Sequence, residues 1–259
     1  MVRRIITVLL AVAVLAALAG CGDGGEMSLS DYRKTISELH DSVAWDMGDT
    51  VEELNDLDFK DFYDLPDLRM VFLGAEEIFA AAWDIADPIY PPPQAEMLHV
   101  DLLDFYAEGA ESMRDVQNAL GFFEVVLPML RDVENLALPD LPENAGVPEI
   151  KAAAAEDRRT MEGYMRELEG IDPPDDLQPY REKLEGFFRS IDEAVAAVDQ
   201  SVTPENFDSF AQFRQWFATA LVESESLWGE AMSYLDGMSD IIDHYIEMGK
   251  ELAARIQVL

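Results

Sequence analysis

Residues 210–259 read FAQFRQWFATALVESESLWGEAMSYLDGMSDIIDHYIEMGKELAARIQVL, and their apolar positions recur with a seven-residue period. Steps of seven from Phe210 give Phe217, Ser224, Ala231, Met238, Tyr245, Leu252 and Leu259, and steps of seven from Phe213 give Ala220, Leu227, Tyr234, Ile241, Met248 and Arg255. This spacing is typical of a helix packed in a bundle. An unbroken helix over this stretch would be about 75 Å long. We therefore expect a bend near Gly229 or at Asp236-Gly237.

The rest of the chain shows the same three- and four-residue apolar spacing, and no segment alternates as a strand would. Ser30 is the expected N-cap of the first helix, and Thr203-Pro204 is the expected start of the last one. The expected helices cover about residues 30–57, 66–86, 94–136, 149–170, 176–200 and 204–259, with a loop over 137–148. We predict an all-α fold, an elongated bundle of about six helices.

Two proline pairs indicate an internal repeat. Pro92-Pro93 and Pro173-Pro174 lie 81 residues apart, and each pair joins two predicted helices. At the same offset the residue pairs are His99 with Tyr180, Asp101 with Glu182, Leu103 with Leu184, Asp104 with Glu185, and Tyr106 with Phe187. One interpretation is a duplicated helix–Pro-Pro–helix hairpin, flanked by a first and a long last helix. The other is that proline turns between amphipathic helices resemble one another without duplication.

The N-terminus has the features of an export signal. Arg3 and Arg4 precede an apolar run over residues 5–18, which is too short for a comfortable membrane span of roughly 20 residues. The sequence Leu18-Ala19-Gly20-Cys21 resembles the lipobox of bacterial lipoproteins. This resemblance implies cleavage before Cys21, a diacylglyceryl thioether on its sulfur, and acylation of the new amine. A plain signal peptide and a short uncleaved anchor are the alternatives.

The domain boundaries follow from this interpretation. We predict a signal peptide over residues 1–20, a flexible tether over 21–29, and a helical bundle domain over 30–259. Two or three acyl chains give stable anchoring, so the protein is expected at the cell membrane, on its extracytoplasmic side. Cys21 is the single cysteine of the chain, which excludes an internal disulfide framework, a cysteine zinc site and a CxxC redox pair.

The chain is strongly acidic. It has 259 residues, with 18 Lys and Arg against 53 Asp and Glu, and a formal net charge of −35. Phosphate binding needs clustered basic residues, so nucleic acid is excluded as an expected partner. Anionic lipid headgroups should repel the body of the protein, so the expected link to the membrane is the lipid alone. The acidity is explained equally by a salt-rich habitat or by function.

Two short motifs combine histidine with carboxylates at helical spacing. One is the step from Glu96 to His99, and the other is the step from His244 to Glu247. The step from His244 to Glu247 resembles the H-x-x-E signature of imelysin-type iron-uptake proteins, which are exported helical bundles, although Ile242 stands where that family has glycine. The candidate ligands for a divalent cation are Glu96, His99, Asp240, His244 and Glu247. The alternative is that both histidines are ordinary surface or boundary residues among carboxylates.

An acidic segment over residues 52–67 offers a second candidate cation site through oxygen ligands. Asp58, Asp61 and Asp64 recur every three residues, but the spacing of an EF-hand loop is lacking. A solvated acidic surface is the alternative interpretation.

The sequence contains no nucleophile elbow, phosphate-binding loop, dinucleotide fingerprint or zinc-protease motif. We expect a non-enzymatic protein without a cofactor, which binds or scaffolds an envelope protein partner through helix faces or a groove between the hairpins. The alternatives are a metal-binding or metal-delivery lipoprotein that uses His and carboxylates, and a structural spacer. Exposure would favour binding at any of the four tryptophans: Trp45, Trp83, Trp216 and Trp228.

Overall fold

The computed structural model describes residues 27–57, 62–142 and 144–259. Within these ranges the only β-type pairing is an isolated antiparallel bridge between Thr203 and Asn206, so the predicted all-α class is confirmed. The helices are α2 (Leu29–Asp56), α3 (Leu65–Ala86), α4 (Glu96–Asp132), α5 (Ala137–Asp140), α6 (Val147–Glu169), α7 (Gln178–Ser201), α8 (Asp208–Gly237) and α9 (Ser239–Val258). Among the described helices, none is long and apolar enough to cross a membrane.

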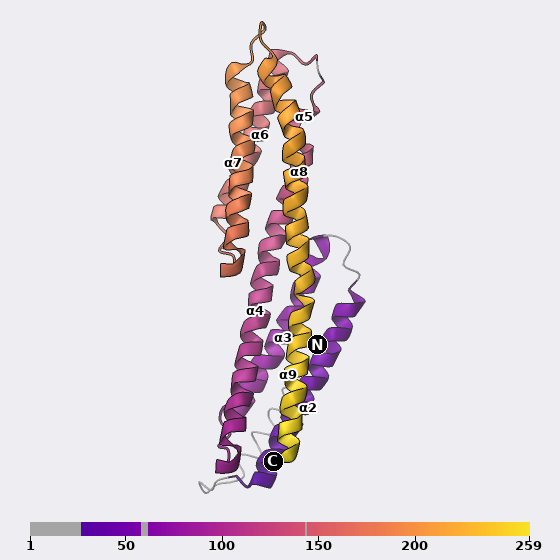
Figure 1. The fold of residues 1–259 in the computed structure, drawn as a ribbon, viewed down its shortest axis with the longest axis vertical. Helices are drawn as coiled ribbons and strands as arrows, with labels where there is room; N and C mark the ends of the chain where they lie inside the picture. Colours follow the sequence, from indigo (N-terminus) through magenta and orange to yellow (C-terminus); the bar gives the residue numbers. More distant parts are fainter. Residues whose placement is uncertain (1–26, 58–61, 143) are drawn as a thin grey trace. The chain divides into compact units, whose positions relative to one another are not determined.

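The chain divides into two compact units, where one bundle domain was predicted over residues 30–259. Unit 1 contains α2, α3, α4 as far as Gln117, and α9. Unit 2 contains the rest of α4, together with α5, α6, α7 and α8. Helix α4 therefore supplies a helix to each unit, and the α8–α9 segment does the same (Figure 1). The predicted signal peptide and most of the predicted tether lie outside the described residues.

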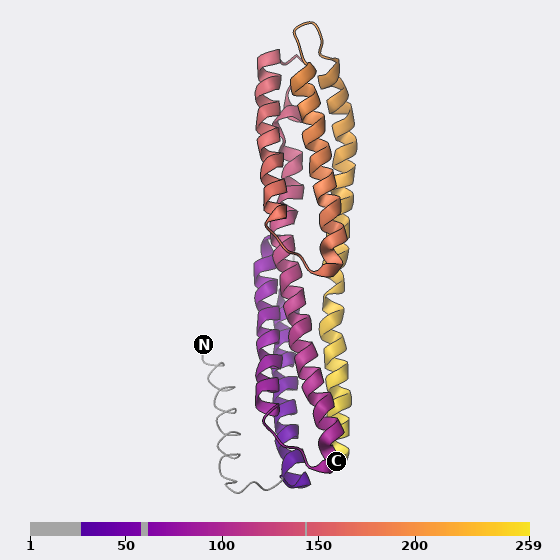
Figure 2. The same ribbon diagram turned by 90° about the vertical axis from the view of Figure 1, so that its left-hand side faces the viewer.

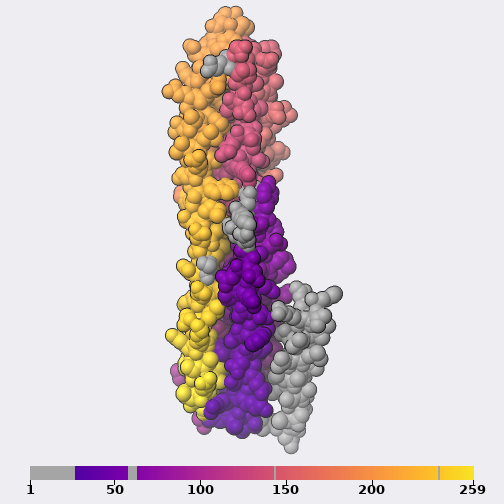
Figure 3. Space-filling model, turned by 90° about the vertical axis from the view of Figure 1, so that its right-hand side faces the viewer, coloured from indigo at the N-terminus to yellow at the C-terminus, as the bar shows by residue number. Residues whose placement is uncertain are grey.

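The core of unit 1 centres on Phe79 of α3. Its ring lies 5.5 Å, centroid to centroid, from the rings of Phe105 on α4 and Tyr245 on α9. Gly109 allows this close approach, because a Cβ atom at that position would lie only 2.7 Å from the Phe79 ring. Helix α2 completes the unit and packs along α9 (Figure 3).

Unit 2 is a second helical bundle, in which α6 and α7 form a hairpin (Figure 2). Helix α8 packs on α7, and the short α5 packs on α6. The Tyr180 hydroxyl donates a hydrogen bond of 2.9 Å to the carbonyl of Leu227, which joins α7 to α8. The Ser224 hydroxyl donates one of 3.1 Å to the carbonyl of Leu130, which joins α8 to α4. These bonds satisfy backbone carbonyls through buried side chains.

Several predicted helix ends are wrong by a few residues. The N-cap of α2 is Ser28 rather than Ser30, because the Ser28 hydroxyl accepts a hydrogen bond of 3.1 Å from the Asp31 amide. The last segment begins at Asp208 rather than at Thr203-Pro204. Thr203 and Asn206 instead pair their backbones at 3.0 Å, and the Asn206 side chain accepts from the Asp208 amide. Such local side-chain bonds compete with helix formation.

The predicted loop over residues 137–148 contains a helical turn, α5. The Asp157 carboxylate of α6 accepts hydrogen bonds from the amides of Ala137 (2.7 Å) and Leu138 (2.8 Å). An anion at a helix N-terminus satisfies amides that lack partners within the helix. The turn therefore depends on a carboxylate some twenty residues away, which local sequence does not indicate.

The predicted interruption of the last segment is confirmed at Gly237, where α8 ends and α9 follows. The first heptad series is buried from Phe210 to Leu252, but the second series is not. From Tyr234 onward its buried positions shift by one residue, to Leu235, Ile242 and Ile256. The buried positions Leu227, Ala231 and Leu235 follow one another by two steps of four, where a heptad alternates three and four. The additional residue compensates for the difference between the 3.5 residues per turn of a heptad and the 3.6 of a straight helix. It lies close to the boundary between unit 2 and unit 1.

The helix–Pro-Pro–helix repeat is present in both units, but at an offset of 82 residues rather than 81. Pro92 and Pro174 each precede a three-residue 3-10 turn, and the next helix begins at Glu96 or Gln178. The first helices of the two hairpins also begin 82 residues apart. Buried positions correspond at this offset: Phe72 with Ala154, Phe79 with Met161, Ala86 with Leu168, Leu102 with Leu184, Phe105 with Phe187, and Met113 with Val195. An 81-residue offset instead pairs buried Leu184 with the half-buried Leu103.

Candidate functional site

The strongest concentration of buried polar side chains in unit 1 is the His–Tyr cluster, which consists of Tyr32, His40, His99, Tyr106 and the backbone of Gly249. His40 lies in the core with a relative exposure of 3%. Its Nε2 lies 2.7 Å from the Gly249 carbonyl of α9, and its Nδ1 lies 3.1 Å from the Tyr106 hydroxyl of α4. One imidazole therefore joins α2 to two other helices.

The proton positions of His40 follow from these partners. A carbonyl only accepts, so Nε2 carries the proton and donates to Gly249. Nδ1 then accepts from the Tyr106 hydroxyl. Burial lowers the pKa of His40 below its usual value of 6.5, although the bond to Gly249 and the charge of Asp41 oppose this. The cluster thus stabilises the neutral imidazole.

His99 of α4 makes a similar contact with Tyr32 of α2. Its Nδ1 lies 3.1 Å from the Tyr32 hydroxyl, and the two rings meet edge to face at a centroid distance of 5.8 Å. Burial lowers the pKa of His99, against the opposing charge of Asp87. Burial also raises the pKa of Tyr32 to about 12. Both buried histidines of unit 1 are consequently paired with a neutral phenol rather than with a carboxylate.

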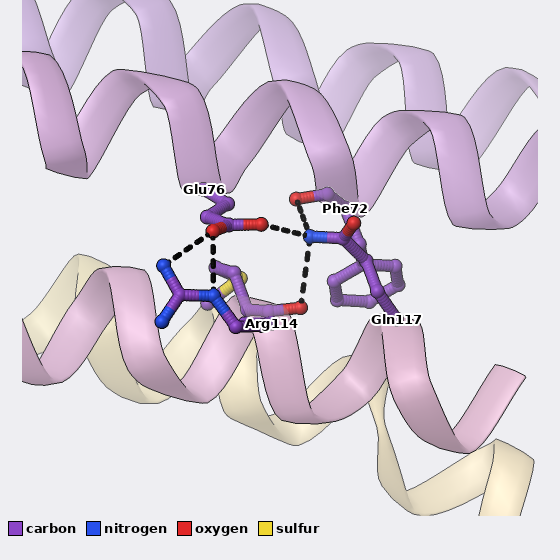
Figure 4. A network of polar contacts seen from close by, with 5 residues as sticks. Phe72, Glu76, Arg114 and Gln117 are labelled. Carbon is purple, nitrogen blue, oxygen red and sulfur yellow. Dashed lines mark hydrogen bonds and ion pairs between the residues drawn. The ribbon is translucent and has the colours of Figure 1, made fainter. Parts of the chain in front are cut away.

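A second polar network joins α3 to α4 at the surface of unit 1 (Figure 4). Arg114 contacts the Glu76 carboxylate through Nη2 at 2.7 Å and through Nε at 2.9 Å. The Gln117 amide donates to the other oxygen of Glu76 at 2.6 Å and to the carbonyl of Met113 at 3.3 Å. Glu76 therefore has partners on both oxygens. These contacts fix the packing of α3 on α4 near Gln117, the last residue of α4 that belongs to unit 1.

The predicted cation ligands do not gather in one place. His99 is buried against Tyr32, while Glu96, three residues before it, is exposed. His244 and Asp240 are exposed, and Glu247 forms an exposed ion pair of 2.6 Å with Lys250. Among the described residues, no group of three or more His, Cys, Asp and Glu side chains is arranged to hold a metal ion. The geometry gives the cation alternative no support in that part of the chain.

Some predicted site residues fall outside the described part of the chain. Cys21 and the lipobox lie in residues 1–26, and Asp58 and Asp61 of the acidic segment lie in 58–61. The structure therefore adds nothing to either prediction. Asp64 is described, half-buried, in a 3-10 turn before α3.

The tryptophans differ in exposure, which was the criterion for a binding surface. Trp45 on α2 is 73% exposed, whereas Trp216 and Trp228 on α8 are half-buried. The side chain of Trp83, near the end of α3, is 36% exposed. Trp45 is therefore the most exposed tryptophan of the described helices.

Sequence reasoning missed the partners in the His–Tyr cluster. Neither Tyr32 nor Gly249 was among the predicted site residues. Tyr106 is 66 residues from His40 and Tyr32 is 67 residues from His99, so no local spacing joins them. The available signal was that His40 adjoins Leu39 on the buried face of α2, because a histidine there needs a polar partner.

Comparison with known proteins finds no matching family model, no matching curated protein sequence and no matching solved structure. The functional conclusions therefore depend on the residues and their geometry.

Proposed function

We propose that this protein is anchored by lipid at Cys21 to the extracytoplasmic side of a cell membrane, where its helical body has a non-enzymatic binding or scaffolding role. The anchoring part is supported by Leu18-Ala19-Gly20-Cys21 after a short apolar run. The first described helix begins at Leu29, so the folded part starts soon after the proposed attachment point.

The observation that carries the binding role is Trp45. Its side chain is 73% exposed in the middle of α2, whose opposite face is buried in unit 1. Tryptophan is enriched among residues that contribute most to binding at protein interfaces. Asp41 and Asp49 lie four residues to either side, on the same helix face. A suitable partner would present an apolar pocket for the indole with basic groups beside it.

The anchor is tested by replacing its sulfur. In cells of the native host, Cys21→Ser should move the protein from the membrane fraction to the soluble extracytoplasmic fraction. Intact-mass analysis of the wild-type protein should show loss of residues 1–20 and a gain of acyl chains. A Cys21→Ser protein that remains in the membrane and uncleaved would mean that the lipobox interpretation is wrong or that the apolar run over residues 5–18 is itself an anchor.

The binding role is tested at Trp45 independently of the anchor. A photoreactive phenylalanine analogue placed at residue 45 should give one discrete crosslinked species on intact cells. The same analogue at the exposed Val222 of α8 is the control and should give none. Crosslinking should also fall when a Trp45 peptide from α2 is added in excess. Equal crosslinking at both positions, or none at residue 45, would favour the structural spacer instead.

A further inference from the structure

We infer that one end of unit 1 rests on the lipid bilayer, through the interfacial region of the membrane rather than through a protein. This end, here called the apolar end, consists of residues 27–34, 82–101 and 255–259. It comprises the start of α2, the α3–α4 connection with the helix turns beside it, and the end of α9. The inference rests on the proposed lipid anchor and adds how the anchored body is oriented.

Two contacts and one short connection place these segments at the same end of unit 1. The Tyr32 hydroxyl of α2 lies 3.1 Å from His99 Nδ1 in the first turns of α4. Arg255 near the end of α9 forms an ion pair with Asp101 of α4. The α3–α4 connection is short, so α3 ends where α4 begins. Figures 1 and 2 show α9 ending, at the label C, beside the start of α4.

Exposed apolar side chains concentrate at this end. Five of the ten large apolar side chains that the structure describes as exposed belong to these 33 residues: Trp83, Tyr90, Met97, Val100 and Val258. Tyr90 and Val258 are each 85% exposed, and Met97 is 82% exposed. Tyrosine and tryptophan favour the membrane interface, where an apolar ring and a polar group are both accommodated. The composition of the apolar end therefore fits that depth of a bilayer.

The apolar end is also far less acidic than the rest of unit 1. It contains five acidic and three basic side chains, with Arg33, Lys34 and Arg255 as the basic ones. The remainder of unit 1 beyond residue 34 contains nineteen acidic and three basic side chains. Anionic headgroups repel carboxylates and attract Lys and Arg over about a Debye length. The apolar end is the part of unit 1 that can approach such a surface at the lowest electrostatic cost.

The length of chain before α2 brings this same end to the membrane. Six residues lie between Cys21 and the N-cap Ser28, which makes seven steps along the chain. A chain of that length spans at most about 25 Å when fully extended. The N-terminal end of α2 must therefore stay within that distance of acyl chains attached at Cys21. The contact between Tyr32 and His99 then keeps the α3–α4 connection at a similar distance from the membrane as the start of α2.

The test uses the full-length, lipidated protein in vesicles of phosphatidylcholine with a minor fraction of phosphatidylglycerol. Because Cys21 is the only cysteine and carries lipid in this proposal, single cysteines introduced by Met97→Cys or Val258→Cys can be labelled with a polarity-sensitive fluorophore. Met70→Cys is the matched control, since Met70 is also exposed (58%) but lies in the first turns of α3, at the other end of that helix from the apolar end. Lipids bearing a headgroup-proximal nitroxide should quench labels at 97 and 258 several-fold more than the label at 70.

The outcomes separate this inference from the anchor. If the protein floats with the vesicles but all three labels are quenched equally, the anchor is supported and the apolar end is refuted as a contact. If the wild-type protein carries no lipid and does not float, the anchor itself fails and this inference fails with it. In a Tyr90→Asp variant carrying the Met97→Cys label, quenching should fall although the protein still floats. Unchanged quenching there would also contradict direct contact, and circular dichroism checks that the variant is folded.

Discussion

Replacement of Gly109 by alanine should destabilise unit 1, although alanine is the better helix former. A Cβ at this position would lie 2.7, 2.8 and 2.9 Å from three carbons of the Phe79 ring. Optimal carbon–carbon contacts are about 3.5–4.0 Å, so the ring must move by most of an ångström. Phe105 and Tyr245 lie against that ring, each at a centroid distance of 5.5 Å, and leave it little freedom.

The magnitude follows from two opposing terms. Overpacking of a tight core costs about 1–3 kcal/mol. Replacing glycine by alanine inside a helix contributes about 1 kcal/mol in the opposite direction. The free energy of unfolding of unit 1 should therefore fall by up to about 2 kcal/mol in Gly109→Ala. Gly48→Ala is the matched control, because a Cβ at Gly48 meets nothing within 4 Å. It should stabilise the unit by about 0.5–1 kcal/mol.

Urea unfolding followed by tryptophan fluorescence measures this difference. Replacing Trp216 and Trp228 by phenylalanine leaves Trp45 and Trp83, which both belong to unit 1, as the reporters. The two alanine variants should differ by about 1–3 kcal/mol, which is the steric term alone. Adding Phe79→Leu to Gly109→Ala should recover part of the loss. If Gly109→Ala were as stable as Gly48→Ala, the close α3–α4 approach would be wrong.

Three further predictions concern buried polar groups. Tyr106→Phe removes the donor to His40 Nδ1 and should cost about 1–3 kcal/mol by urea unfolding, whereas phenylalanine at the exposed Tyr90 should cost little. Asp157→Ala leaves the amides of Ala137 and Leu138 without their acceptor and should cost about 2–4 kcal/mol; preserved protection of these amides in hydrogen exchange would contradict it. Burial lowers the pKa of His40 and of His99 in the folded state, so the unfolded state binds protons first and stability should fall as pH drops below about 6.5. A His40→Gln, His99→Gln double variant should lose much of that slope between about pH 7 and 5.5.

Periodicity predicted which faces of the helices are buried, but not what they are buried against. The series from Phe210 to Leu252 is buried throughout, as its seven-residue spacing indicated. The same spacing failed after Tyr234, because the segment there passes from the helices of one unit to those of the other. A heptad pattern indicates which face of a helix packs against its neighbours. It carries no information on where one core ends and the next begins.

The candidate site shows the same limit for polar residues. The step from Glu96 to His99 places both side chains on neighbouring positions of α4, and this geometry was expected to make them joint ligands. The boundary of the core falls between them, so His99 is buried and Glu96 is exposed. What determines the role of His99 is Tyr32 on another helix. A spacing rule within one helix cannot indicate that partner.

Comparison of the two hairpins shows that buried apolar residues and buried polar groups have different roles in the fold. Their buried apolar positions correspond at an offset of 82 residues, so one pattern suffices for both. Their buried polar groups do not correspond at this offset. Gln117 bonds to Glu76 within its own hairpin, whereas four others bond to a helix outside it. Those bonds join His99 to Tyr32 of α2, Tyr106 to His40 of α2, Tyr180 to Leu227 of α8, and Asp157 to Ala137 and Leu138 of α5. A buried polar group is costly without its partner, so these bonds disfavour any other pairing of helices. Apolar spacing thus makes each hairpin, and polar side chains determine which helices it accepts.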